Sequence, residues 1–310
     1  MRRVVVLALL LASLPLATAT QELRLPNKAG SVRFAIIGDS GEPGTGQTAV
    51  AKQMASWRTR FPFEFVLMMG DNLYGTERAR DYAKKFEQPY KALLDGGVKF
   101  YAALGNHDDG GQTQYKPFNM DGKLYYTFKA PKEDVRFFAL ESTYMDQDQL
   151  KWVEDELKKS GEKWKIVFFH HPLYSSGATH GSADAQRQLL EPIFLKYGVN
   201  VAFTGHEHFY ERIHPQKGVA YFIIGSSSKL RKGDLRKSSL TVYGNDSAYS
   251  FMLAEIDGDE LYFQTISDKG ETLDAGSIKR AGDVAPNRGV TTQPVVPQSA
   301  PSPVQPGPGK

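Results

Sequence analysis

Three short strings in the chain place oxygen and nitrogen ligands for metal ions directly after apolar runs. They are Gly70-Asp71-Asn72-Leu73-Tyr74, Gly105-Asn106-His107-Asp108 and Gly205-His206-Glu207-His208. Together with Asp39 and His170, these strings supply enough donors to hold two metal ions side by side. Two metal ions about 3.5–4 Å apart suit the cleavage of phosphate esters, because together they stabilise the attacking and the leaving oxygen.

A site for two metal ions needs one shared carboxylate and further ligands on each side. Asp71 can take the shared position. The remaining candidate ligands divide into Asp39, Tyr74 and His208 for one ion and Asn106, His170 and His206 for the other. Five of the seven histidines lie in or beside these strings, and this concentration favours metal binding over separate packing roles.

The composition narrows the chemistry further. The chain contains no cysteine, which excludes thiolate zinc sites, iron–sulfur clusters and cysteine nucleophiles. Any metal is therefore held by nitrogen and oxygen ligands, which suit hard or borderline ions. The formal net charge is only +3, so no overall field favours nucleic acid or a membrane as the partner.

Both ends of the chain differ in composition from the part between them. Arg2 and Arg3 precede an apolar stretch at residues 4–16, and the small residues 17–19 follow. This layout predicts a signal peptide at residues 1–19 and an exported protein, periplasmic or extracellular, with an uncleaved anchor as the alternative. Residues 284–310 are rich in proline and predict a disordered tail. One catalytic domain remains, at residues 22–282.

Apolar runs of strand length alternate with helical patterns between these ends, which predicts an α/β fold built from βαβ units. The expected strands are residues 32–37, 65–69, 98–104, 135–140, 166–169, 199–204, 220–224, 249–256 and 261–266. The expected helices are residues 47–59, 77–94, 146–159 and 183–197. A tight hairpin turn at Asp257-Gly258-Asp259 is expected to join the last two strands.

Every candidate ligand region begins where one of these predicted strands ends. Asp39 and Asp71 follow the first two runs, Asn106 follows the third, and His170 and His206 follow two later ones. The carboxyl ends of parallel strands meet at one edge of an open α/β sheet, and sites form there. We therefore expect these side chains to lie close together.

Five blocks of the sequence resemble those of the purple acid phosphatases, which belong to the calcineurin-like metallophosphoesterases. Besides the three strings above, the blocks are Asp39-Ser40-Gly41 and Val167-Phe168-Phe169-His170. The similarity extends from Val32 to about Arg212. Tyr74 makes the resemblance more specific to the purple acid phosphatases, since most calcineurin-like relatives lack a tyrosine there. Because Asp39 comes soon after the predicted signal peptide, the chain looks like the small, single-domain type.

The resemblance implies a four-layer α/β/β/α sandwich of the metallophosphoesterase type with a binuclear metal centre at one sheet edge. It implies that Tyr74 binds Fe(III) as a phenolate and that the second ion is divalent Fe, Zn or Mn. His107 is expected to contact substrate and to protonate the leaving group. His180, by resemblance, is a second catalytic candidate, with a solvated loop residue as the alternative. His171 is expected to orient the site, with core packing as the alternative, and Asp108 is expected to support His107, with capping of the following turn as the alternative.

The expected function is a metal-dependent acid phosphatase that hydrolyses small phosphate monoesters through attack of a metal-bound hydroxide, with an acid pH optimum. One alternative is a phosphodiesterase or nuclease on the same centre. Another is a metal-containing binding protein without catalysis. A cluster of basic residues could guide anionic substrates or could be an ordinary solvated loop; it consists of Lys229, Arg231, Lys232, Arg236 and Lys237.

Overall fold

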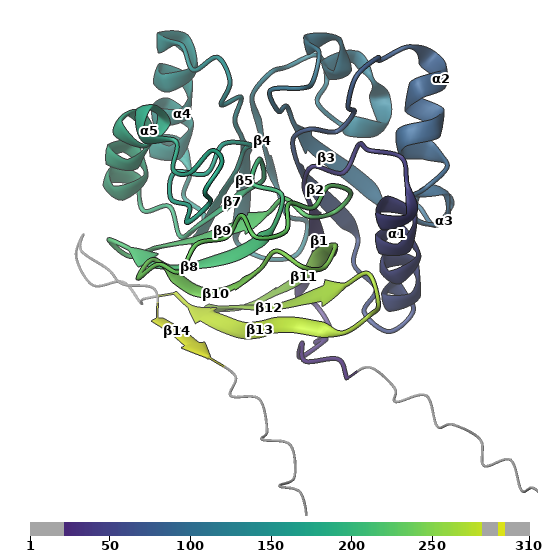
Figure 1. Ribbon diagram of the computed structural model, residues 1–310. Coiled ribbons are helices and arrows are strands. Elements are labelled where there is room, and N and C mark those ends of the chain that lie inside the picture. The colour runs from purple at the N-terminus through teal and green to yellow at the C-terminus, as the bar shows by residue number, and fades with distance from the viewer. Residues whose placement is uncertain (1–21, 281–290, 295–310) are drawn as a thin grey trace, which may run out of the picture.

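The computed structural model describes residues 22–280 and 291–294, which form two seven-stranded sheets with helices on their outer sides (Figure 1). The first sheet has the strand order β14-β13-β12-β11-β1-β2-β3. Its strands are β1 (Val32–Ile37), β2 (Phe65–Met69), β3 (Lys99–Ala103), β11 (Ser250–Asp257), β12 (Glu260–Ser267), β13 (Thr272–Lys279) and β14 (Thr291–Pro294). Strands β1, β2 and β3 run parallel to one another, and β11 is antiparallel to β1.

The second sheet has the order β10-β8-β9-β7-β6-β5-β4. Its strands are β4 (Tyr126–Lys129), β5 (Val135–Ala139), β6 (Trp164–Phe168), β7 (Val201–Thr204), β8 (Tyr210–Gln216), β9 (Val219–Ile224) and β10 (Thr241–Asn245). Strands β5, β6, β7 and β9 are parallel. Each sheet thus has a parallel centre whose carboxyl ends can carry a site.

The helices cover the two sheets from outside. Helices α1 (Thr45–Arg58), α2 (Ala79–Tyr82) and α3 (Lys91–Asp95) lie on the side of the first sheet. Helices α4 (Gln147–Lys159) and α5 (Asp184–Tyr197) lie on the side of the second (Figure 1). The shorter turns are η1 (Ala83–Glu87), η2 (Gly110–Gln114) and η3 (Lys116–Phe118). The predicted four-layer α/β/β/α arrangement is confirmed.

Two apolar cores hold these layers together. Between the sheets, Phe34 of β1 lies 5.3 Å from Phe137 of β5 and 6.3 Å from Phe203 of β7, measured between ring centres. Outside the second sheet, Phe169 contacts Phe194 of α5 with ring centres 6.2 Å apart. Because the central strands are buried on both faces, their sequences are nearly continuous in apolar residues.

All nine predicted strands occur, with ends that differ by at most two residues, and the hairpin turn between β11 and β12 is confirmed. The helix predicted over residues 77–94 is wrong as one element, since the structure divides it into α2, η1 and α3. Pro89 lies between η1 and α3 and accounts for that break, because proline has no N–H to donate to the helical hydrogen bonds. Strands β4, β8, β10 and β13 were not predicted.

Strand β8 shows why such strands escape a search for apolar runs. Its Arg212 is buried, and the guanidinium donates to both carboxylate oxygens of Asp274 on β13, at 2.8 and 3.0 Å. Tyr210 donates to the same carboxylate at 2.8 Å. A buried ion pair of this kind places charged residues inside the sandwich, where a search based on apolar residues does not expect them.

The predicted signal peptide lies outside the described residues, as does most of the predicted tail. Within that tail, Thr291–Pro294 form β14, antiparallel to β13, so the expectation of a tail without regular structure is wrong for these four residues. The reason is that β13 would otherwise be an edge strand with unpaired backbone groups. Among the described residues, none of the helices has the length and apolar composition that a bilayer span requires.

Candidate metal centre

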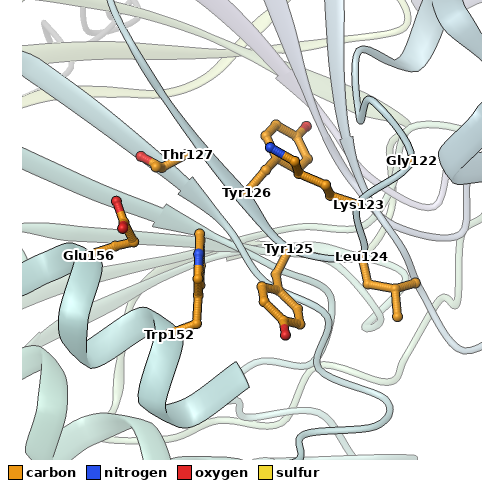
Figure 2. A pocket seen from close by; sticks show the side chains of 8 residues that line it. All are labelled: Gly122, Lys123, Leu124, Tyr125, Tyr126, Thr127, Trp152 and Glu156. Carbon is orange, nitrogen blue, oxygen red and sulfur yellow. The ribbon is translucent and has the colours of Figure 1, made fainter. Parts of the chain in front are cut away.

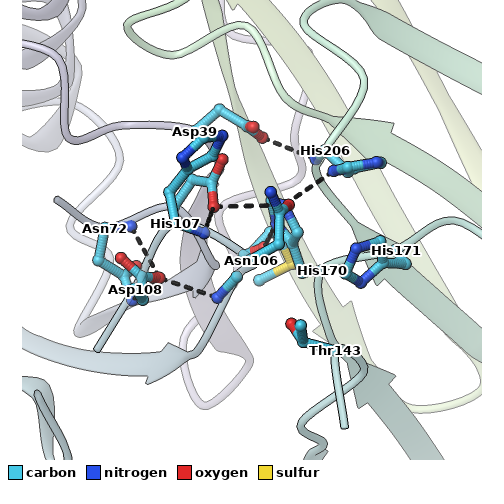
Figure 3. A network of polar contacts seen from close by, with 12 residues as sticks. Asp39, Asn72, Asn106, His107, Asp108, Thr143, His170, His171 and His206 are labelled. Carbon is cyan, nitrogen blue, oxygen red and sulfur yellow. Dashed lines mark hydrogen bonds and ion pairs between the residues drawn. The ribbon is translucent and has the colours of Figure 1, made fainter. Parts of the chain in front are cut away.

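The predicted ligands meet where the two sheets approach each other. Asp39, Asp71 and Asn106 follow β1, β2 and β3 of the first sheet, whereas His170 and His206 follow β6 and β7 of the second. Figure 3 shows side chains from both sheets turned toward one place. The backbone N–H of His206 donates to Oδ2 of Asp39 at 2.8 Å and so joins the two sheets.

Three of these residues adopt backbone conformations that are uncommon for residues with a side chain. Asp39 and Asp71 have φ of 51° and His206 has φ of 69°. Left-handed backbone costs about 1–3 kcal/mol per residue and is concentrated at functional sites. At all three positions the chain turns sharply at the end of a strand, and the turn aims the side chain into the gap between the sheets.

Two glycines allow the strands to end this close together. A Cβ atom on Gly105 would lie 2.3 Å from Oδ1 of Asp71, and one on Gly205 would lie 2.6 Å from Oδ2 of Asp39. Either approach is far shorter than a van der Waals contact. These positions therefore require glycine so that the carboxylates can occupy their places.

One group of donors gathers around Asp39. Asp39, Asp71 and His208 each bring one ligand atom to within 4.8 Å of the others. The hydroxyl of Tyr74 lies 3.1 Å from Oδ1 of Asp39 and 3.3 Å from Nε2 of His208. This group therefore contains the three residues that the sequence predicted for the first ion, together with Asp71, the predicted shared carboxylate.

A second group gathers around His170. Its Nε2 atom lies 3.0 Å from Oδ1 of Asn106, 3.1 Å from Nδ1 of His206 and 3.4 Å from Oδ1 of Asp71. Asp71 therefore contacts both groups, as expected for the shared carboxylate. His171 also brings a ring nitrogen to within 4.8 Å of ligand atoms of His170 and His206.

The protonation state of His170 shows that these atoms suit a cation. Its Nδ1 lies 2.8 Å from the carbonyl oxygen of Met69, which can only accept, so Nδ1 carries the hydrogen. In the neutral ring Nε2 then presents a lone pair, and it faces the lone pairs of the Asp71 carboxylate. A positive ion between these atoms would replace their repulsion by attraction, so the residues fit the metal ions that the resemblance implies.

Burial keeps the imidazoles neutral. It lowers the pKa of His170 well below the usual value, and neighbouring histidines add to this. Burial, and then the charge of Arg231, lower the pKa of His208 to about 4. Burial also lowers the pKa of His171 to about 4 and strongly depresses that of His206. Neutral imidazole is the form that binds metal ions.

The acidic ligands respond in the opposite direction. Burial and the charge of Asp71 raise the pKa of Asp39 well above its usual value. Burial and the charge of Asp39 raise the pKa of Tyr74 far above 10. A bound cation reverses this preference, because it stabilises the carboxylate and the phenolate. Asp39 and Tyr74 would therefore be deprotonated when a metal ion is bound and protonated in its absence.

The two predicted catalytic histidines lie on the exposed side of these groups. His107 is exposed, its ring centre lies 5.0 Å from that of Tyr74, and its backbone N–H donates to Oδ1 of Asp71 at 3.1 Å. His180 is also exposed, and its ring centre lies 4.3 Å from that of His206. Both rings remain accessible to a molecule that approaches the donors.

Asp108 does not orient His107 through any contact that the structure shows. Its carboxylate instead accepts the backbone N–H groups of Gly105 at 2.8 Å, Leu73 at 3.0 Å and Asn72 at 3.1 Å. Burial and the charge of Asp71 raise the pKa of Asp108 to about 7. Asp108 thus ties together the loops after β2 and β3, which carry Asp71 and Asn106. The contacts of Asp108 are thus made to the ligand loops, whereas the expected support was of His107.

His171 has a supporting contact of its own. Its Nδ1 lies 2.9 Å from Oγ of Ser142, and the same hydroxyl accepts its backbone N–H at 3.0 Å. Ser142 was not singled out from the sequence, because a lone serine after a strand carries no motif.

Glu207 was also missed, although it stands inside the third string. It is fully buried, and Oε1 accepts the backbone N–H of Gly181, next to His180, at 2.6 Å. The signal available in the sequence was its place between His206 and His208. The side chain of an acidic residue between two metal-binding histidines either points away from the metal site or hydrogen-bonds to the loops that carry the ligands.

A cleft beside the donors is large enough for a substrate. Its volume is about 730 Å³, and its lining includes Asn106, His107, Asp109, Glu77 and Arg78. The residues that line a second hollow of about 520 Å³ include Tyr125, Tyr126, Trp152 and Glu156 and none of the predicted site residues (Figure 2). Of these two hollows, the first is the one that borders the candidate metal centre, through Asn106.

A two-sheet sandwich that gathers two groups of metal donors around one carboxylate defines a class of hydrolases that work with two metal ions. The chain belongs to the calcineurin-like phosphoesterase family, whose sequence pattern matches residues 32–210. This confirms the family to which the five sequence blocks pointed.

The relatives of the chain include purple acid phosphatases, the group that the five sequence blocks resemble. The chain is 28% identical over 242 residues to purple acid phosphatase 17 of Arabidopsis thaliana, covering 66% of this chain and 71% of that protein. It is 26% identical over 306 residues to tartrate-resistant acid phosphatase type 5 of Rattus norvegicus, covering 81% and 91%. The structure of purple acid phosphatase PPD1 from yellow lupin (Lupinus luteus) seeds matches with a TM-score of 0.68 at 18% identity. That match covers 89% of this chain and 58% of the lupin chain, and it supports the fold.

Proposed function

We propose that this protein is a binuclear-metal acid phosphatase that hydrolyses small phosphate monoesters. The observation that carries the proposal is the position of Asp71. One of its carboxylate oxygens lies 3.4 Å from Nε2 of His170, and the carboxylate also belongs to the donor group of Asp39 and His208. A carboxylate shared by two groups of neutral and anionic donors is what a pair of adjacent metal ions requires.

The seven ligands that the sequence predicted would hold the two ions. Asp39, Tyr74 and His208 would hold the first and Asn106, His170 and His206 the second, with Asp71 between them. Tyr74 favours Fe(III) for the first ion, because a phenolate is a hard anionic donor, and a divalent Fe, Zn or Mn ion suits the second. When bound, such ions polarise a phosphoryl group and lower the pKa of a coordinated water.

The position of the exposed His107 supports a role in proton transfer. His107 lines the cleft that opens beside Asn106, so the ester oxygen of a substrate in this cleft would come within its reach. In the reaction a P–O bond to a water oxygen forms and the ester P–O bond breaks. His107 would supply the proton that the leaving oxygen takes up, and His180 would hydrogen-bond the phosphoryl group from the other side.

The depressed pKa values of the ligand histidines support work at acid pH. His208, with a pKa of about 4, stays neutral at pH 5, where an ordinary histidine would be mostly protonated. The metal-binding form of the site therefore persists under acidic conditions. A phosphodiesterase or nuclease on the same centre is the second candidate, and the basic residues from Lys229 to Lys237 are the feature that favours it.

The first experiment measures metal content, visible spectrum and turnover on one sample. We expect about two metal ions per chain, a visible charge-transfer band and hydrolysis of para-nitrophenyl phosphate at acid pH. Turnover of bis(para-nitrophenyl) phosphate at an equal or higher rate would favour the diesterase. A protein that holds metal ions but turns over neither ester would overturn the proposal in favour of a binding protein without catalysis.

We also infer that residues 1–19 direct export, so that the enzyme works outside the cytoplasm. The support is the order of basic, apolar and small residues at the N-terminus. N-terminal sequencing of the protein from a cell fraction or from the medium tests this inference. A mature protein that starts at Thr20 outside the cytoplasm is the expected result, and an uncleaved cytoplasmic chain would contradict it.

A further inference from the structure

One imidazole beside the second donor group has no place among the predicted ligands. His171 directly follows His170, and its ring centre lies 5.0 Å from that of His170 and 4.4 Å from that of His206. Figure 3 shows these three side chains next to one another. The sequence left open whether His171 orients the site or packs in the core. The contacts of the ring favour neither role and indicate a third.

The distances allow His171 to share an ion with its neighbours. His170, His171 and His206 each bring one ring nitrogen to within 4.8 Å of the other two. Two nitrogens that bind one zinc ion, each about 2.0–2.1 Å from it, lie at most about 4.2 Å apart. A small rotation of the half-buried His171 ring closes the difference. In the described part of the chain, the donor group around Asp39 is the only other cluster of histidine and acidic side chains this close together.

The ring of His171 is held in the way that a metal-binding histidine usually is. Its Nδ1 lies 2.9 Å from Oγ of the fully buried Ser142, as Nδ1 of His170 lies 2.8 Å from the carbonyl oxygen of Met69. One lone pair of the Ser142 hydroxyl accepts the backbone N–H of His171 at 3.0 Å, and the second can accept the hydrogen of Nδ1. In that tautomer Nε2 of His171 has a free lone pair. Histidine ligands ordinarily donate their other ring N–H to a neighbouring acceptor, which fixes the ring for the metal.

Neither of the two expected roles fits these contacts. A residue that orients a ligand by a hydrogen bond contacts that ligand, but among the described residues the hydrogen-bond partner of the His171 ring is Ser142 and not a ligand side chain. A packing residue is enclosed, whereas His171 is half-buried, unlike Phe169 and Leu173 on either side of it in the sequence. A half-buried imidazole with one nitrogen anchored and the other unused suits an additional metal ligand.

We propose that His171 is a further ligand of the second ion and that this ion is zinc. Three imidazoles, from His170, His171 and His206, would then join Asn106 and Asp71 around it. Imidazole nitrogen suits zinc, whereas manganese prefers oxygen ligands, and zinc binds more tightly than divalent iron to the same site. The inference rests on the proposed binuclear-metal function and names which of the three divalent ions occupies its second position.

The first experiment counts the imidazoles that bind zinc. The chain contains seven histidines, and long-range proton–nitrogen NMR can follow them in the full-length protein with isotope-labelled histidine. Such spectra distinguish a metal-bound ring nitrogen from one that carries hydrogen or a free lone pair. The metal-free protein is compared with protein that holds zinc at both positions. The predicted ligands His170, His206 and His208 account for three metal-bound rings, and we expect a fourth, from His171.

His171→Asn assigns the fourth signal, which should be missing from the spectrum of this variant. The asparagine amide can keep the hydrogen bond to Ser142, so the nitrogen that would bind zinc is the main loss. His214→Asn is the matched control, since His214 is an exposed histidine on β8. It should remove a signal that does not respond to zinc. Three zinc-bound rings, with His171 unchanged on loading, would overturn the inference while the phosphatase proposal stands.

The second experiment compares two metals. Protein with Fe(III) in the first position is dialysed against zinc and against manganese, which gives the affinity of the second position for each ion. We expect His171→Asn to weaken zinc binding at least about 10- to 100-fold, because losing a group that merely supports a ligand already has an effect of this size. Manganese binding should change less, since manganese prefers oxygen ligands. His214→Asn should change neither affinity.

The outcomes separate this inference from the function on which it rests. Equal weakening of zinc and manganese binding by His171→Asn would mean that His171 only positions its neighbours, and it would contradict the ligand role. If zinc shifted no histidine signal in the wild type, both this inference and the binuclear-metal function would be wrong.

Discussion

The backbone N–H of His206 donates to the carboxylate of Asp39 at 2.8 Å, although the two residues are 167 positions apart in the chain. Asp39 follows β1 in one sheet and His206 follows β7 in the other. This hydrogen bond therefore closes the gap between the sheets at the metal-ligand groups. Each group depends on both sheets, so a change that moves the sheets relative to each other will affect both metal positions.

Asp108 should prove necessary for the ligand loops. Replacing it by alanine leaves the N–H groups of Asn72, Leu73 and Gly105 without their acceptor. We expect a loss of about 3 kcal/mol in the free energy of unfolding and weaker metal binding. Urea denaturation and metal analysis measure these effects. Asp95→Ala, which removes an exposed carboxylate from α3, should change stability by less than about 0.5 kcal/mol. Equal effects of the two substitutions would contradict the role of Asp108.

His107→Ala should lower kcat for para-nitrophenyl phosphate about 100- to 1000-fold, the usual contribution of a general acid. Metal content should stay at the wild-type level, because no metal-ligating role is assigned to this exposed side chain. His214→Ala provides the control, since His214 is an exposed histidine on β8 outside all the motifs. If His107→Ala turned over substrate at the wild-type rate, its proposed role in proton transfer would be wrong.

Tyr74→Phe tests the phenolate. We expect the visible band of the iron-loaded protein to disappear, because the substitution removes the oxygen that lies 3.1 Å from Oδ1 of Asp39 and leaves the ring in place. Tyr144→Phe is the control, since Tyr144 is 82% exposed. An absorption spectrum of each variant is sufficient. A band that persists unchanged in Tyr74→Phe would show that another group gives rise to it.

The centre should keep its metal ions in moderately acid solution. A free histidine with the ordinary pKa of about 6.5 gains a proton as the pH falls through that value, and from there on protons compete with a metal ion for its ring. The pKa values of His171 and His208 are lowered to about 4, so their rings gain a proton only near that pH. A bound cation also offsets the burial that raises the pKa of Asp39. Equilibrium dialysis should show metal retained at pH 5 and released only at about pH 4 or below. A midpoint of release near pH 6.5 would contradict this expectation.

Parts of the site could be predicted because they depend on local sequence. Asp39, Asp71 and Asn106 were placed correctly at strand ends, since an apolar run followed by glycine and a polar residue is visible without a structure. The contacts of Asp108 and Glu207 could not be predicted. Their partners are backbone N–H groups, which every residue except proline has, and only the folded arrangement determines which of them an acid meets.

The sequence by itself determined the kinds of donor, their order and their places at the ends of strands, because strand formation follows from the pattern of neighbouring residues. The tertiary structure decided which donors share a group, that Asp71 contacts both groups, and that Lys229 lies over the ring of Tyr74. These relations join residues far apart in the chain. They depend on how two sheets pack through one common core, and no local pattern records that packing.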